Sequence, residues 1–230
     1  MHIVLLPGMD GTGELFGPLV EALPEGVKVT IVRYPRAEVL GWDGLLELVE
    51  AAVPIGEPYC VVAESFSGPI AMRFAAAKPL GLQSLVLCAS FCRNPLAKGL
   101  GWIARFARPA IFKRRPPGAF VRRYLVDASS PETLVDSVQQ AIAQVNPGVM
   151  ANRVKLVNES NTAAELGKVK VPVLYLEGSR DRIVGGRGWM QVHAAHPSTE
   201  HGLLDGPHLL LQCVPKHASA AILSFLERHR

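Results

Sequence analysis

The stretch "VVAESFSGPIA" (residues 61–71) predicts a strand that enters a sharp turn and leaves it as a helix. The turn holds Ser65, and small residues flank it at Ala63, Ser67 and Gly68. Small residues allow a strand and a helix to approach each other closely at such a turn. A strand that runs directly into a helix is typical of a parallel sheet covered by helices.

The same alternation of short β-rich runs and helical patterns extends along the chain on both sides of this stretch. Runs such as "HIVLL", "SLVLCA" and "VPVLYLE" are almost wholly apolar, as strands covered on both faces require. We predict strands at residues 2–6, 28–32, 59–63, 84–89, 171–177 and roughly 200–204, and helices at residues 14–23, 42–52, 65–77, 188–195 and 209–228. The fold class is therefore α/β, a three-layer sandwich with helices on both faces of a mostly parallel sheet.

Residues 91–165 interrupt this alternation, because they contain several helical patterns and no convincing strand. We interpret them as a helical insertion between the fourth and fifth strands. The chain of 230 residues, 49% of them hydrophobic, has enough apolar material for one sizeable core. We therefore predict a single domain over residues 1–230.

Composition argues against several classes of protein. No apolar run reaches the roughly 18 residues that a membrane-spanning helix needs, and no signal sequence precedes the first strand. Cys60, Cys88, Cys92 and Cys213 form no C-x-x-C pair, which favours buried thiols in a reduced compartment. The net charge of +4 is too small to indicate a nucleic-acid partner. We predict a soluble cytoplasmic protein without stable membrane insertion.

Three chemically complementary residues follow predicted strands: Ser65 the third, Asp181 the fifth and His208 the sixth. Functional groups in open parallel sheets gather at the carboxyl ends of the strands, so these side chains can converge. A serine hydroxyl becomes a nucleophile when an imidazole takes its proton, and the imidazole needs a carboxylate that fixes its tautomer. We therefore predict a catalytic triad of Ser65, His208 and Asp181.

Ser65 and His208 each have a structural alternative. Serine is a favoured helix N-cap, and a helix starts at Ser65. His208 follows "DGP" and precedes an apolar helical run, where it could also cap the last helix. The order of the three residues and the motifs around them favour catalysis in both cases.

The acid of the triad has weaker competitors. The stretch "SFCRNPLAKG" after the fourth strand contains no carboxylate, which leaves Asp181 first and Glu177, at the strand end, second. Asp181 could instead form a surface ion pair with Arg180 or Arg182. Asp205 is expected to shape the turn before the last helix.

Four motifs in this order resemble the α/β-hydrolase family: "LLPGMDGTG" (residues 5–13), "AESFSG" (63–68), "EGSRDRIV" (177–184) and "LLDGPHLLL" (203–211). The resemblance covers nearly the whole chain. It departs from the family pattern G-x-S-x-G, since Ala63 and Ser67 replace the two glycines, but both residues are small. The resemblance implies that the backbone N–H groups of Met9 and Phe66 hold the oxyanion.

The resemblance also implies which strands are present. Members of the family usually carry two further strands before the one that leads into the oxyanion loop, which here begins at His2. We therefore expect a sheet of about six parallel strands that lacks the first two family strands, with residues 28–32 at one edge.

The segment "PGMDGTG" has a phosphate-binding loop as its alternative. It matches neither G-x-G-x-x-G nor a P-loop with its lysine, so a nucleotide site is disfavoured. His193, His196 and His201 have neither a carboxylate motif nor cysteines at ligand spacing. We predict no metal and no organic cofactor.

At its place in such a fold, the insertion of residues 91–165 looks like a lid over Ser65. Its aromatic candidates for lining the substrate pocket are Trp102, Phe106, Phe112 and Phe120.

The insertion is also basic, because no Asp or Glu occurs between Ser65 and Val126. Its basic residues in that stretch are Arg93, Lys98, Arg105, Arg108, Lys113, Arg114, Arg115, Arg122 and Arg123. On a helix through residues 96–108, Lys98 and Arg105 would lie opposite the apolar side chains. This face is either solvated or meets an anionic partner, such as an acyl carrier protein, coenzyme A or an anionic membrane surface.

These observations predict a carboxylesterase that cleaves small-molecule esters through an acyl-enzyme. In size and organisation the chain resembles family esterases that act on carrier-bound acyl methyl esters. One alternative is a thioesterase or acyltransferase that uses the same residues on carrier- or CoA-linked acyl groups. The other is a non-catalytic module whose basic insertion holds an acidic partner.

Overall fold

The apolar runs of the sequence form the central sheet of the fold. In the computed structural model, residues 1–95 and 108–229 are described. Within them, the strands are β1 (His2–Leu6), β2 (Lys28–Ile31), β3 (Tyr59–Glu64), β4 (Leu82–Cys88), β5 (Val173–Gly178) and β6 (Glu200–Leu204). The described strands form a six-stranded sheet in the order β2-β1-β3-β4-β5-β6, and each neighbouring pair is parallel. The predicted strands are confirmed, and β2 lies at one edge as expected.

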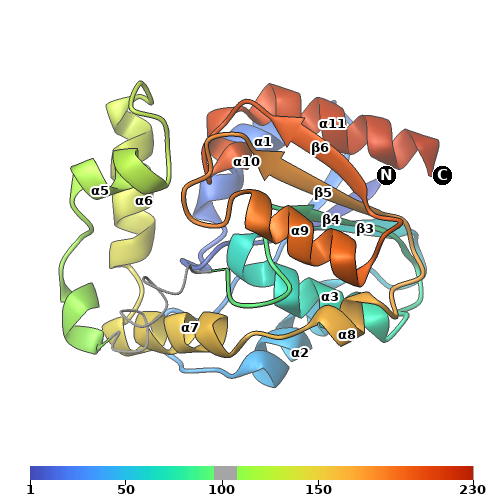
Figure 1. Cartoon of the computed structure of the whole chain (residues 1–230), viewed down its shortest axis with the longest axis horizontal. Helices are drawn as coiled ribbons and strands as arrows, with labels where there is room; N and C mark the ends of the chain where they lie inside the picture. The colour runs from blue at the N-terminus through green and yellow to red at the C-terminus, as the bar shows by residue number, and fades with distance from the viewer. Residues whose placement is uncertain (96–107, 230) are drawn as a thin grey trace.

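Helices cover both faces of the sheet (Figure 1). One face carries α2 (Trp42–Ala52), α3 (Gly68–Ala76), α8 (Ala163–Leu166) and α9 (Gly186–Ala195). The opposite face carries α1 (Gly17–Ala22), α10 (Leu210–Cys213) and α11 (Pro215–Arg228). The helix predicted at residues 209–228 is in fact two helices, because Pro215 has no N–H to donate and starts a new helix.

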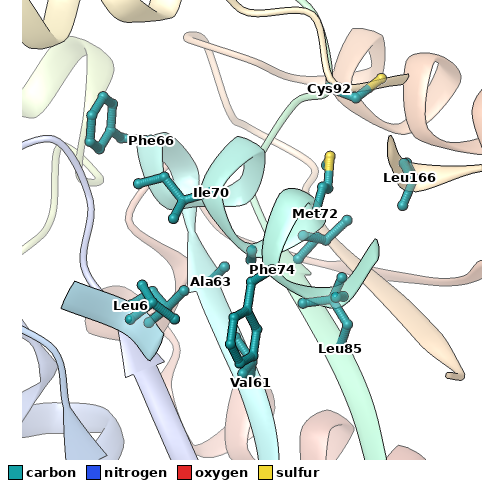
Figure 2. Packing of buried hydrophobic residues seen from close by; sticks show 14 of the residues in the cluster. Leu6, Val61, Ala63, Phe66, Ile70, Met72, Phe74, Leu85, Cys92 and Leu166 are labelled. Atoms are coloured by element: carbon teal, nitrogen blue, oxygen red, sulfur yellow. The ribbon is translucent and has the colours of Figure 1, made fainter. Parts of the chain in front are cut away.

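The pleat of each strand sends alternate side chains to the two faces, and in the central strands both faces are apolar. In β3, Val61 and Ala63 pack under α3, whereas Cys60 and Val62 face α11. Figure 2 shows the first of these clusters, in which Ile70 and the neighbouring α3 side chains lie over the strands. This double burial explains why the central strands lack the alternating polar residues of a sheet with one wet face.

The insertion between β4 and β5 is helical in its described part. It contains η3 (Pro109–Lys113), α5 (Gly118–Tyr124), α6 (Glu132–Ala143), α7 (Pro147–Glu159) and α8. α5 and α6 lie beyond the end of the sheet toward which the strands point (Figure 1). Val121 and Val135 of these helices form a cluster with Leu15 and Leu209, which follow β1 and β6. The insertion therefore packs against the loops at the carboxyl ends of the strands. The helix predicted at residues 96–108 lies, except for its last residue, outside the described residues.

Two further features bear on the composition. Among the described helices, none has the length and apolar content needed to cross a membrane. All four cysteines are free thiols, and three of them are buried.

Candidate active site

Ser65 occupies a strained turn at the carboxyl end of β3. Its φ of 47° lies in the left-handed region that non-glycine residues rarely adopt. The Ser65 carbonyl accepts a hydrogen bond of 2.7 Å from the Ser90 hydroxyl. Gly68 has to be glycine here, since a Cβ would lie 1.7 Å from the Ser90 Oγ. Strain of this kind persists only where surrounding contacts hold it, and it clusters at functional sites.

The three predicted triad side chains meet at the carboxyl ends of β3, β5 and β6. The Ser65 Oγ lies 2.9 Å from the Nε2 of His208, and the Nδ1 of His208 lies 2.9 Å from the Oδ2 of Asp181. The other carboxylate oxygen of Asp181 accepts the backbone N–H groups of Ile183, at 2.8 Å, and Val184, at 3.1 Å. Asp181 is therefore held in one orientation, and the Ser65 hydroxyl is directed to the imidazole rather than to a capping role.

The competing acids have other partners. Arg180 forms ion pairs with Asp127, at 3.0 Å, and with Asp205. Glu177 lies 2.8 Å from the Nε2 of His201. Of the carboxylates that the sequence left open, Asp181 is the one that reaches the imidazole.

Burial and charge act in opposite directions on the triad. Burial by itself lowers the pKa of His208, but the adjacent Asp181 carboxylate outweighs it, so the pKa is raised above the ordinary histidine value. Burial raises the pKa of Asp181, but His208 and the two backbone N–H groups outweigh it and lower that pKa. An ionised carboxylate beside a basic imidazole is the charge distribution that a general base needs.

Glu64 is a second buried carboxyl, directly before Ser65, that the motif analysis did not single out. Burial and the nearby Asp10 raise the pKa of Glu64 to about 7. Its charge in turn raises the pKa of His208. A signal was present in the sequence, because a carboxylate at the end of an otherwise apolar central strand has no solvent to hydrate it.

The loop after β1 lies beside the elbow, because β1 and β3 are neighbours in the sheet. The Ser67 hydroxyl donates to the carbonyl of Pro7 and lies 2.6 Å from the hydroxyl of Tyr34. The Phe66 ring is buried and stacks on Trp42, with 5.4 Å between ring centroids. Both side chains that follow Ser65 are therefore anchored, and Ser67 joins the elbow to the loop that carries Met9.

This arrangement suits acyl transfer: an activated hydroxyl at the end of a strand, with the backbone of a neighbouring loop beside it. The profile of the alpha/beta hydrolase family matches residues 3–220. The chain belongs to the alpha/beta hydrolase family. The resemblance inferred from the four motifs is confirmed, and so is the fold class. Membership of this family indicates a hydrolase.

Individual relatives of this alpha/beta hydrolase are distant. Phytyl ester synthase 1 of Arabidopsis thaliana is 33% identical over 103 residues, which cover 41% of this chain and 15% of that protein. A lipase-esterase related protein from Clostridium acetobutylicum is 14% identical with a TM-score of 0.80, covering 97% of this chain and 93% of the other. A thermophilic esterase from Thermogutta terrifontis is 18% identical with a TM-score of 0.80, covering 100% and 91%. At these identities the structural likeness shows a shared fold.

The predicted pocket residues of this hydrolase have different surroundings. Phe112 packs with Met9 against a small cluster around Val149 of α7. Phe120 is 44% exposed, and its ring centroid lies 5.0 Å from that of Tyr124. Trp102 and Phe106 lie outside the described residues. Phe112 is therefore the described candidate that shares a cluster with a predicted oxyanion residue.

Besides Glu64, two polar residues of the site escaped the motif analysis. Ser90, which holds the Ser65 carbonyl, follows the apolar run of β4 and carries no local signal. Arg153 of α7 was detectable, because it shares one face of its helix with Val149, Leu156 and Val157, where a buried charge needs an explanation.

Proposed function

We propose that this hydrolase cleaves carboxylic esters through an acyl-enzyme formed on Ser65. The observation that supports this best is the chain of hydrogen bonds from Asp181 through His208 to Ser65, ending on a serine with a φ of 47°. A non-catalytic fold has no reason to retain both the strain and a buried, charge-paired imidazole. Small and medium acyl esters are the default substrates.

In this mechanism His208 takes the proton of Ser65 as the hydroxyl attacks the ester carbonyl. The backbone N–H groups of Met9 and Phe66 stabilise the oxyanion that develops. His208 then protonates the leaving alcohol, and water repeats the sequence in reverse to release the acid. Asp181 holds the imidazole in the tautomer with its free Nε2 lone pair toward Ser65 and stabilises the imidazolium.

A second function, transfer or hydrolysis of carrier- or CoA-linked acyl groups, uses the same residues. Two observations favour it as the alternative: the partial match to a plant ester synthase, and the basic character of the insertion. Lys113, Arg114 and Arg115 are exposed consecutive cations at the C-terminal end of η3, of which Lys113 is the last residue. We propose that this surface of the lid receives an anionic carrier or coenzyme A.

Labelling with a fluorophosphonate tests the nucleophile directly. We expect one adduct, located by peptide mapping on Ser65, and none after denaturation, because the reagent needs the activated hydroxyl. An adduct on another residue would exclude the mechanism. Rates on p-nitrophenyl esters and on acyl-CoA, with and without an alcohol acceptor, then separate esterase, thioesterase and acyltransferase. Only the CoA-linked rates should fall steeply with salt if the basic surface is used.

The pH dependence of kcat/KM should show a single acid limb with a pKa above the ordinary histidine value of about 6.5. Activity falls as the pH falls, because the imidazolium form of His208 cannot accept the proton of Ser65. Asp181 and the fraction of Glu64 that is ionised supply the charges that raise this pKa. Glu64→Gln should therefore move the limb to lower pH while leaving the plateau rate similar. A limb that stays in place or moves to higher pH would contradict this assignment.

A further inference from the structure

Arg153 is a buried cation in the helical insertion that the proposed mechanism does not use. It lies in α7 (Pro147–Glu159) and is 2% exposed. A guanidinium removed from water costs several kcal/mol unless its N–H groups are hydrogen-bonded. Its partners therefore indicate what the residue is for.

The hydrogen-bond acceptors of the guanidinium are backbone carbonyls. One terminal nitrogen, Nη1, donates to the carbonyls of Met9, at 2.9 Å, and Asp10, at 2.7 Å. The other, Nη2, donates to the carbonyl of Pro35 at 3.0 Å. Among the described residues, no carboxylate lies within ion-pair distance of Arg153, and a carboxylate oxygen of Asp10 is occupied by the N–H and hydroxyl of Thr12. The planar fork of an arginine is suited to bridging several fixed acceptors in this way.

These bonds complete the set of hydrogen bonds to the backbone carbonyls of residues 7–11, the loop after β1. The Pro7 carbonyl is bound by Ser67, the Gly8 carbonyl by the N–H of Gly11, and the Gly11 carbonyl by the N–H of Tyr34. Arg153 binds the remaining two carbonyls between them. Within the described part of the chain, the Met9 N–H has no protein acceptor. The carbonyls of the loop are thus held in place, whereas the Met9 N–H, the donor assigned to the oxyanion, is free to bind it.

The loop is also shaped around the guanidinium. Gly11 has a φ of 68°, and a Cβ at this position would lie 2.6 Å from the Nη1 of Arg153. A left-handed glycine lets the backbone turn closely around the cation, which a side chain would prevent. The conformation of the loop and the position of the Arg153 guanidinium therefore depend on each other.

We propose that Arg153 is a positioning residue, which holds the loop of residues 7–11 so that the Met9 N–H faces the oxyanion and thereby couples the helical insertion to turnover. This inference rests on the proposed esterase function. A donor that is displaced by a fraction of an ångström stabilises the transition state less but leaves ester binding largely intact.

The test compares Arg153→Gln and Arg153→Lys with the wild type. The glutamine amide is too short to reach the Met9 carbonyl, so we expect kcat on p-nitrophenyl esters to fall about 10²-fold with little change in KM. The lysine ammonium keeps the charge but cannot bridge to Pro35, so a loss of about tenfold is expected. The inhibition constant of a trifluoromethyl ketone, whose adduct with Ser65 carries the oxyanion, should rise by a similar factor.

A general distortion of the site would give a different pattern. The pKa in the kcat/KM profile should stay that of the wild type, because Arg153 does not contact His208. Lys155→Gln, at an exposed position of the same helix, is the matched control and should leave every parameter unchanged.

Three results would overturn the inference. The first is a folded Arg153→Gln variant with the kcat and the inhibitor affinity of the wild type. The second, if the glutamine variant does not fold, is an Arg153→Lys variant with these wild-type values. The third is a loss of kcat that is accompanied by a shifted pKa in the kcat/KM profile. Failure of the proposed function is distinct, since the wild type itself would then neither turn over esters nor bind the ketone.

Discussion

Ser65→Ala is expected to lower kcat on p-nitrophenyl esters on the order of 10⁶-fold, which leaves only the catalysis supplied by binding and the oxyanion donors. The reason is geometric. Among the described residues, the side-chain hydrogen-bond partner of the Ser65 hydroxyl is His208, at 2.9 Å. Removal of this hydroxyl deletes the nucleophile and leaves His208 with no serine proton to accept. The measurement is kcat under saturating substrate, with freshly purified protein to exclude contaminating esterase. The melting temperature should change little, because alanine also fits the small-residue turn.

Ser137→Ala, at an exposed position of α6, serves as the matched control and should retain full activity. Activity that survives Ser65→Ala would favour the non-catalytic module over the esterase. In that case, the next measurement is the binding of an acidic partner to the basic insertion.

Asp181→Asn is expected to lower kcat about 10⁴-fold without unfolding the protein. One oxygen of Asp181 accepts the N–H groups of Ile183 and Val184, so the carbonyl oxygen of the introduced amide must occupy that place. The amide nitrogen is then forced toward the Nδ1 of His208, where it donates. The imidazole consequently carries its proton on Nε2 and cannot accept the proton of Ser65.

The matched control is Asp205→Asn, three residues before His208. Asp205 is paired with Arg180 on the surface, so this variant should remain within a few-fold of the wild type. If Asp205→Asn were the more damaging change, the acid would have been assigned to the wrong loop. The loss in Asp181→Asn should also be accompanied by a lower pKa in the rate profile, since the charge that raises the pKa of His208 is removed.

The sequence predicted the strands and most helices because each depends on a local pattern. Short, near-continuous apolar runs rich in Val and Leu favour strands with two covered faces, and the runs predicted as strands are strands of the observed sheet. Helix ends were predicted less well. The single helix expected at residues 209–228 is divided at Pro215, and the one expected from residue 65 begins as the tight turn η2 (Ser65–Ser67) before α3.

The three candidate triad residues were also found in sequence, because each follows a strand of a parallel sheet. The choice among carboxylates was not local. Asp181, Glu177 and Asp205 are equivalent in chemistry, and only their partners in space separate them. The roles assigned to Glu64 and Arg153 likewise rest on their neighbours in space, which the sequence does not show.

The sequence by itself determined the layered α/β architecture and the positions of Ser65, Asp181 and His208 at the ends of their strands. The reason is that the spacing of apolar residues and the succession of strands and helices along the chain can be read from the sequence. Only the tertiary structure decided which groups hold the loop after β1. Ser67 and Arg153 reach its carbonyls from segments 60 and 144 residues away. Contacts between such distant segments depend on the packing of α7 and the elbow against one loop, and no local pattern carries that information.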